Sequence, residues 1–394
     1  MRKIIKEGEN MEVKQIYALM NDVTGEILGK TDLIQEDLSN VVDVGVEIFN
    51  ASSVDNYVRS LVNHIGRVIF VNRPYSGNTP SILRDGWEYG SVLEKIQADI
   101  PEATENETWM LEDGASYDPN VFYKPSVSAK FFNKKVTFEV PMSITERQVK
   151  ESFSNAAQLN GFISMLYNAV DRSITVKIDS LIMRTIDNMI AETVYTEYGA
   201  ANLNSKSTVK AVNLLYLYNQ RYSKSLSASD SITDPDFIRF AAYEMGVYMS
   251  RMSKISTLFN VGGKDRFTPS DMLHVVTLAD FKKAANVFLQ SDVFHNIFTE
   301  LPNSEIVPYW QASGQGYSFT DISKVYVTTA ENHNVTVTGI LGVMFDRDAL
   351  GVCNLDRRVT TNYNAKAEFF NYWHKFEAGY FNDFNENFVV FFVA

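Results

Sequence analysis

Apolar residues that recur at every fourth position constrain the fold of this chain more than any other feature. The row consists of Phe162, Leu166, Val170, Ile174, Ile178, Ile182, Ile186 and Ile190. This spacing predicts a helix. Because an α-helix has 3.6 residues per turn, a four-residue spacing drifts around it by about 40° per step. The apolar surface should therefore wind around the helix and meet different partners along its length.

Capping signals predict where this helix begins and ends. Ser143 and Glu146 have the spacing of a capping box, which predicts a helix start at Ser143. Asn160 and Gly161 could kink or briefly break the helix. Gly199 suits the left-handed conformation that ends many helices. From Gly161 to Gly199 the helix would be about 50 Å long, far more than is usual in a globular protein.

Composition excludes several classes of function. The chain has 394 residues, enough for two or three domains, and 36 basic against 48 acidic residues give a net charge of −12. Without a basic cluster, tight sequence-independent binding to nucleic acid or to an anionic membrane is disfavoured. The single cysteine, Cys353, rules out an intrachain disulfide and fits a reducing cytoplasm. We expect neither a Sec-type signal peptide in the first 14 residues nor a membrane helix.

The segment from Trp87 to Val140 is the second informative stretch. Residues around Val92–Ile100 and Val136–Val140 alternate between apolar and polar, which predicts strands at both flanks. Between Trp87 and Pro125 there are nine acidic and two basic residues, whereas the return flank carries Lys130, Lys134 and Lys135. We therefore predict a two-stranded excursion that finds complementary charge on another copy of the chain. The alternative is a mobile acidic surface loop.

The remaining sequence predicts a mixed α+β domain and a strand-rich end. Helices are expected at Val209–Tyr222, Asp236–Leu258 and Asp280–Leu289, and strands at His274–Leu278, Lys324–Thr329 and Val335–Phe345. The last 39 residues hold 12 of the 50 aromatic residues. The chain ends on an apolar run, Phe388–Val393, which must be buried or paired because it would aggregate as an exposed edge strand.

No pattern in the sequence indicates catalysis. The five histidines, His64, His274, His295, His333 and His374, have no acidic residue or cysteine at metal-ligand spacing, and Cys353 is expected to be a core residue. The glycine-bearing loops Asn260–Lys264 and Ser313–Gly316 lack the phosphate-loop pattern and are predicted to be turns. Asn382, Asp383, Asn385 and Glu386 could offer oxygen ligands to calcium, but their spacing is not that of an EF-hand. We therefore expect no cofactor, no metal and no enzymatic activity.

Two segments carry a resemblance to a known family. Residues Phe138–Glu146 lead from the excursion towards the long helix, and Gly342–Val352 lie late in the chain. In these segments and in the order of its parts, the chain resembles the major capsid proteins of tailed bacteriophages with the Hong Kong 97-like fold. The resemblance implies an α+β fold with these parts: an N-terminal arm at 1–50, a peripheral domain with a spine helix at 51–86 and 141–206, an extended loop at 87–140, an axial domain at 207–345, and C-terminal strands shared by both domains at 346–394.

The resemblance also implies a function. Hexamers and pentamers of the chain would assemble in the host bacterial cytoplasm into an icosahedral shell around double-stranded DNA, with scaffold and portal proteins as partners and no sequence-specific DNA binding. Contacts between subunits are expected at Lys95, Glu102, Glu105, Glu107, Lys130, Lys134 and Lys135. Because few residues precede Trp87, we expect a separate scaffold protein or a processed chain. The alternatives are an encapsulin-like nanocompartment shell, a virion tail or adhesion component, and an enzyme with an unrecognised site.

Overall fold

A computed structural model of the chain describes two compact units. The first comprises described residues within 135–182 and 353–379, and the second comprises those within 80–134, 183–352 and 380–394. The described residues are 80–84, 93–98, 100–101, 103, 112–114, 120, 122, 124, 126–145, 156–199, 202–290, 304–311, 316–329 and 332–394, with the backbone alone at 156–168 and 289–290. The predicted N-terminal arm at 1–50 and the loop at Ser313–Gly316, apart from Gly316, lie outside them.

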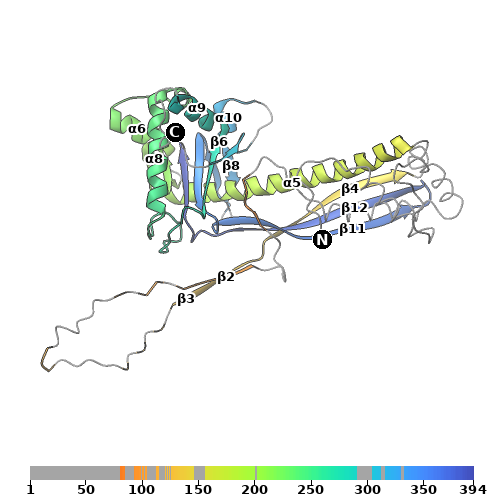
Figure 1. Ribbon diagram of the computed structural model, residues 1–394, viewed down its shortest axis with the longest axis horizontal. Helices are drawn as coiled ribbons and strands as arrows, with labels where there is room; N and C mark the ends of the chain where they lie inside the picture. The colour runs from red at the N-terminus through yellow and green to blue at the C-terminus, as the bar shows by residue number, and fades with distance from the viewer. Residues whose placement is uncertain are drawn as a thin grey trace. The chain divides into compact units, whose positions relative to one another are not determined.

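The long helix is present as α5 (Ala156–Tyr198), an uninterrupted element of 43 residues that passes through both units (Figure 1). The four-residue row is confirmed as its buried side wherever side chains are described: Val170, Ile174, Ile178, Ile182, Ile186 and Ile190 are all buried. Asn160 and Gly161 do not break the helix. Gly199 follows its last turn with a φ of +59°, which confirms the predicted cap.

The predicted helix start at Ser143 is wrong. Ser143 lies in β4 (Lys135–Thr145), which pairs antiparallel with β12 (Phe369–Asn382) along its whole length. The Ser143 hydroxyl donates to Oδ1 of Asn371 on β12 at 2.6 Å, and Ile144 is buried. Cross-strand pairing with β12 thus fixes Ser143 in an extended conformation. The capping-box spacing therefore does not mark a helix start at this position.

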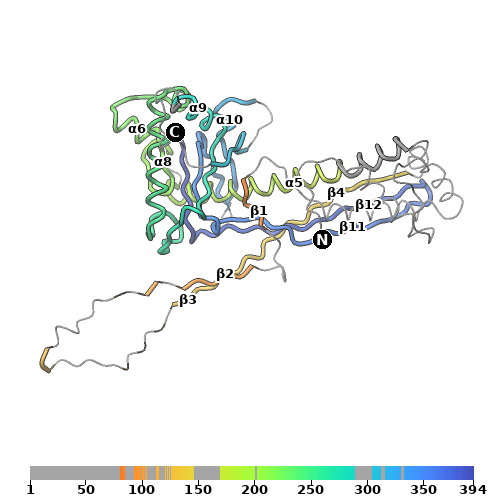
Figure 2. Tube along the Cα trace, viewed as in Figure 1, coloured from red at the N-terminus to blue at the C-terminus, as the bar shows by residue number. Residues whose placement is uncertain are grey.

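The first unit is built on long strands beside its part of α5. Here β12 lies between β4 and β11 (Leu350–Asn364), and Figure 2 traces β4 and β12 side by side. The rings of Phe138 and Phe376 stack across the β4–β12 pair with centroids 4.9 Å apart. The Asn364 side chain accepts from two backbone amides in the turn between β11 and β12. Phe376, one of the aromatic residues near the end of the chain, therefore forms a cross-strand pair.

The core of the second unit is a five-stranded sheet with the order β5-β13-β10-β6-β7. Its strands are β5 (Ala211–Asn213), β6 (Leu273–Leu278), β7 (Glu305–Val307), β10 (Ile340–Asp346) and β13 (Phe388–Phe392). β13 is parallel to β5 and antiparallel to β10, and every residue in it is buried. The prediction that the terminal apolar run must be buried or paired is confirmed.

Three helices pack against this sheet: α6 (Leu214–Tyr222), α8 (Pro235–Met252) and α9 (Ala279–Gln290) (Figure 1). The unit also contains the short helices α7 (Ala228–Ser231) and α10 (Phe319–Ile322) and the turn Leu203–Ser205. The Asp234 side chain caps α8 ahead of Pro235, as the sequence predicts. The helix predicted from Val209 begins instead at Leu214, because Ala211–Asn213 pair with β13 and Asn213 caps α6.

One further strand prediction needs correction. The strand predicted over Val335–Phe345 is divided into β9 (Asn334–Val337) and β10, and β9 pairs with β8 (Val325–Thr328). Gly339 lies at the division with a φ of +78°, a conformation that favours glycine. Short β1 (Leu83–Arg84) pairs with β11.

The excursion contains a hairpin, but its strands are not the predicted pair. β2 (Leu93–Ala98) pairs antiparallel with β3 (Val127–Phe132), whereas the predicted return strand at Val136–Val140 belongs to β4 in the first unit. In the part of the chain that is described, no helix is long and apolar enough to span a membrane.

Candidate functional site

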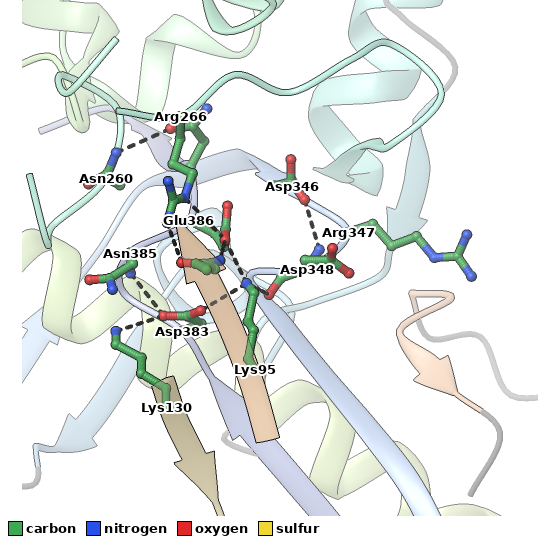
Figure 3. Close-up of polar contacts among 12 residues, drawn as sticks. Lys95, Lys130, Asn260, Arg266, Asp346, Arg347, Asp348, Asp383, Asn385 and Glu386 are labelled. Atoms are coloured by element: carbon green, nitrogen blue, oxygen red, sulfur yellow. Dashed lines mark hydrogen bonds and ion pairs between the residues drawn. The ribbon is translucent and has the colours of Figure 1, made fainter. Parts of the chain in front are cut away.

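The base of the β2–β3 hairpin meets an acidic turn, Asp383–Asn387, which joins β12 to β13 (Figure 3). Lys95 on β2 is the central contact. Its Nζ lies 2.9 Å from Oδ2 of Asp383 and 2.6 Å from Oε1 of Glu386, and it also donates to the backbone oxygen of Asp348 at 3.3 Å. One ammonium group thus joins the hairpin to two carboxylates on the turn.

The cross-strand partner of Lys95 strengthens this contact. Lys130 on β3 lies directly opposite Lys95, and its Nζ is 2.9 Å from Oδ1 of Asp383. Burial alone would raise the pKa of Asp383, but hydrogen bonds from the two lysines outweigh it and lower the pKa below its usual value. Asp383 is therefore ionised although its side chain has no exposed surface, because the two lysines match its charge.

Glu386 connects the hairpin to a second loop. Its Oε1 accepts from Nε2 of Gln97 at 2.5 Å and forms an ion pair with Nε of Arg266 at 3.4 Å. Arg266 in turn donates to Oε1 of Gln97. Lys95, Gln97, Lys130, Arg266, Asp383 and Glu386 are hereafter called the anchor cluster.

The acidic turn is itself held from several sides. The Asn385 amide donates to Oδ1 of Asp383 at 3.1 Å, and the Gly262 amide donates to the Phe384 oxygen at 2.8 Å. A Cβ at Gly262 would overlap the Asn385 side chain, which would have to move to make room for it. The predicted turn at Asn260–Lys264 is confirmed, and its role is to support the acidic turn.

The chemistry of the anchor cluster is ion pairing. The two carboxylates that could have bound calcium instead accept hydrogen bonds from lysine and glutamine side chains, and Glu386 also forms an ion pair with Arg266. Among the described residues no group of three or more histidine, cysteine or acidic side chains is placed to hold a metal.

Most of the predicted contact lysines have partners within the chain. Lys95 and Lys130 belong to the anchor cluster, and Lys135 pairs with Oε1 of Glu377 at 2.9 Å. Lys134 is exposed and its backbone oxygen accepts from the Tyr380 amide. Glu102, Glu105 and Glu107 lie outside the described residues. Whether any of the seven meets another subunit stays a prediction.

The described histidines pack against other residues. His274 stacks on Phe345 with centroids 5.5 Å apart, and His333 stacks on Tyr195 at 4.6 Å. His374 is buried on β12, and desolvation lowers its pKa to about 4. Cys353 is buried, as predicted. His64 and His295 lie outside the described residues.

The sequence contained one signal that could have revealed the anchor cluster. Lys95 and Lys130 stand at alternating positions of strand-forming segments, and Asp383 and Glu386 stand in a short acidic turn between two strands. We predicted that the charges of the excursion would find complements on another copy. The pairing of opposite charges within one chain was missed, because a separation of more than 250 residues gives no local signal.

The sequence and the fold were compared with known proteins. The family described as "Phi29-like phage major capsid protein" matches residues 16–392. The major capsid protein of Bacillus phage GA-1 is 23% identical over 199 residues, which cover 48% of this chain and 39% of that protein. The match therefore spans well under two thirds of the relative's own length.

Two solved phage structures resemble the fold. The capsid structure of Staphylococcus phage Andhra matches with a TM-score of 0.47 and 10% identity, over 82% of this chain and 87% of that one. A structure of the head fiber and inner core protein gp22 of bacteriophage P68 matches with a TM-score of 0.47 and 10% identity, over 79% and 83%.

The family match places the chain in a class: it is a structural protein of a bacteriophage virion and not an enzyme. The match covers nearly the whole sequence, including the hairpin, α5 and the terminal strands. The chain belongs to the family of Phi29-like phage major capsid proteins.

Proposed function

We propose that this chain is the subunit of an icosahedral shell that forms from hexamers and pentamers and encloses double-stranded phage DNA. The single observation that carries the proposal is the family match over residues 16–392. The net charge of −12 is compatible with a shell that confines DNA without holding it tightly everywhere, since a strongly basic protein would hold the phosphate backbone tightly.

We further propose the Hong Kong 97-like division of the chain. In this division residues 1–50 are an N-terminal arm, 87–140 an extended loop that reaches a neighbouring subunit, 51–86 and 141–206 a peripheral domain, 207–345 an axial domain, and 346–394 the C-terminal strands that both domains share. The length of α5 and the hairpin at β2–β3 support this division. The acidic residues Glu102, Glu105 and Glu107 and the lysines of the loop remain proposed contacts between subunits.

Scaffold and portal proteins are proposed partners, and the bacterial cytoplasm is the proposed place of assembly. The test is electron microscopy of cells that express the chain with the neighbouring phage head genes. Closed angular particles are the expected result. Folded monomers alone would contradict the proposal, and rods or trimers would favour a tail or adhesion component instead.

A further inference from the structure

Helices α6 and α8 contact each other in the second unit, and Figure 1 draws them side by side. A cavity of about 560 Å³ lies between them. Side chains three or four positions apart share one side of a helix. The cavity is lined accordingly from α6 by Tyr218 and Tyr222, and from α8 by Asp236, Phe240 and Tyr243. The anchor cluster contributes no residue to this cavity.

Aromatic rings give the cavity both a buried wall and an exposed rim. Tyr218 and Phe240 are buried, with ring centroids 5.5 Å apart, and the Tyr222 ring lies 5.0 Å from that of Tyr218. Tyr222 and Tyr243 are 51% and 61% exposed. Buried rings form a fixed apolar wall, and exposed rings offer large apolar surfaces to a second molecule. The cavity can therefore hold an aromatic side chain.

The cavity is also locally basic, although the whole chain has a net charge of −12. Three basic residues line it against one acidic residue, Asp236: they are Arg221, Lys224 and Arg239. Lys224 donates to the Tyr218 hydroxyl at 2.9 Å, and this hydrogen bond raises the pKa of Lys224. The ammonium group therefore stays charged beside the aromatic wall.

Two of these cations form only long, exposed ion pairs within the chain. Nη1 of Arg221 lies 3.5 Å from Oε1 of Glu244, and Nζ of Lys224 lies 3.6 Å from Oδ2 of Asp236. The lysine contacts to carboxylates in the anchor cluster are shorter, at 2.6 to 2.9 Å. Because exposed pairs contribute little to stability, an external carboxylate can replace them at small cost.

Positive charge and apolar surface adjoin in this cavity. The Arg221 guanidinium lies over the rings of Tyr222 and Phe240, 5.9 and 6.0 Å from their centroids. The Lys224 ammonium lies 5.2 Å from the centroid of the Tyr218 ring. Cation–π attraction holds the cations beside the rings. A ligand that uses both features must carry its apolar group and its negative charge close together.

We propose that this cavity binds a segment of another protein in which an aromatic side chain stands beside carboxylates. Tyrosine and arginine, which line the cavity, are enriched among the residues that dominate the energy of protein interfaces. The aromatic side chain of the partner packs against the tyrosine rings, and its carboxylates bind Arg221 and Lys224. This inference goes beyond the proposed function, because it concerns a different partner and requires no assembled particle.

Charge favours an acidic protein segment over nucleic acid. Three basic residues against Asp236 leave a net charge of +2 on the lining, and Glu244 lies beside Arg221. A continuous row of phosphates would meet these two carboxylates and the negative charge of the whole chain, and sequence-independent binding of a phosphate backbone needs several cations. A segment with two or three carboxylates needs only the cations that the cavity supplies.

Peptide binding to the unassembled chain tests the proposal. The probe is the fluorescein-labelled peptide Gly-Glu-Glu-Trp-Glu-Gly, and fluorescence anisotropy measures its affinity. In two matched peptides, Gln replaces every Glu or Ala replaces Trp. The acidic aromatic peptide should bind at least about tenfold more tightly than either matched peptide. Its binding should weaken several-fold from about 50 mM to about 300 mM NaCl, because salt screens exposed charges.

Variants of the chain show where the peptide binds. Tyr243→Ala and Lys224→Gln change exposed side chains of the cavity, and each should weaken binding at least about fivefold. The matched controls, Tyr326→Ala and Lys283→Gln, change exposed side chains of the same unit outside the cavity and should leave the affinity unchanged. Circular dichroism checks that all four variants are folded.

Three results would overturn the proposal. The first is equal binding of the three peptides, or no binding of any. The second is tighter binding of an oligothymidylate of about twelve nucleotides that the cavity variants abolish, which would assign the cavity to nucleic acid. The third is a loss of self-association in Tyr243→Ala by sedimentation velocity, which would assign it to a second copy. None of these results depends on whether closed particles form, so the proposed function is tested separately.

Discussion

Replacement of Lys95 by methionine should loosen the hairpin without unfolding the sheet beneath it. The Lys95 side chain is 20% exposed and its two acceptors, Asp383 and Glu386, are 0% and 7% exposed. Methionine keeps most of the apolar stem and removes the charge. When one partner of a charged hydrogen bond is removed, each buried group that is left unsatisfied lowers the stability by about 1–3 kcal/mol. Because Lys130 still binds Asp383 and Gln97 still binds Glu386, we expect a cost of about 2 kcal/mol.

Lys130→Met is the matched comparison. Lys130 is 39% exposed and makes one ion pair, at 2.9 Å, so its loss should cost about 0.5–1 kcal/mol. Hydrogen exchange in the unassembled protein is the assay. A cost of about 2 kcal/mol corresponds to roughly 30-fold faster exchange of the β2 and β3 amides, whereas β10 and β13 should be unaffected. Equal exchange in the two variants, or no change in the hairpin, would refute the anchoring role of Lys95.

The pH dependence of the anchor follows from Asp383. Its pKa is lowered in the folded protein, so its contribution to stability is present above the unfolded value of about 3.9. The contribution is lost only as the pH falls through the lower, folded pKa. Hairpin exchange, corrected for the intrinsic rate, should therefore be the same at pH 8 and pH 5. A several-fold rise by pH 5 would show that Asp383 is not held as described.

Three further predictions concern the core and the turns. Ile178→Ala removes a fully buried side chain of α5 and should cost about 3 kcal/mol in urea unfolding, whereas the exposed Val176→Ala should stay within about 0.5 kcal/mol. Gly339→Ala should lower the free energy of unfolding by about 3 kcal/mol or more, because φ is +78° and the new Cβ would overlap the Val393 oxygen. Gly263→Ala should lower it by about 1 kcal/mol, because φ is +63° but the space around the new Cβ is open. Equal losses in the two variants would contradict the proposed overlap at Gly339. The pKa of His374 is about 4 in the folded protein and about 6.5 in the unfolded chain, so the stability that is present above pH 6.5 is lost as the pH falls towards 4. Between pH 7.5 and pH 5 the free energy of unfolding should fall by about 2 kcal/mol. This loss should be absent in His374→Phe.

Helices whose residues pack with a regular period, or that begin at a clear capping residue, could be predicted from the sequence. The row from Val170 to Ile190 predicted α5, and the Asp234–Pro235 pair predicted the start of α8. The helix start predicted at Ser143 is wrong because the capping-box pattern marks a helix start only where the backbone is free to turn. Here an eleven-residue ladder with β12 fixes the extended conformation, and that partner lies more than 200 residues away.

The site was predicted in part. The lysines of the excursion were identified as interaction residues, but their described partners are in the same chain. β3 was missed because its sequence, Val127-Ser-Ala-Lys-Phe-Phe132, has small and polar residues at the positions where a half-buried strand usually shows apolar ones. Which face of β2 and β3 turns inward depends on the register of the pair, and no single strand encodes that register.

The position of β13 has a consequence for synthesis. This strand occupies an interior place in its sheet, with β5 on one side and β10 on the other, yet it is made after all the other strands of that sheet. Until residue 392 has left the ribosome, β5 and β10 have a gap between them and their apolar edges lack a partner. A nascent chain or a fragment cut short before Phe388 therefore cannot complete this core, and incomplete molecules should be recognised by chaperones and proteases before they can enter a particle.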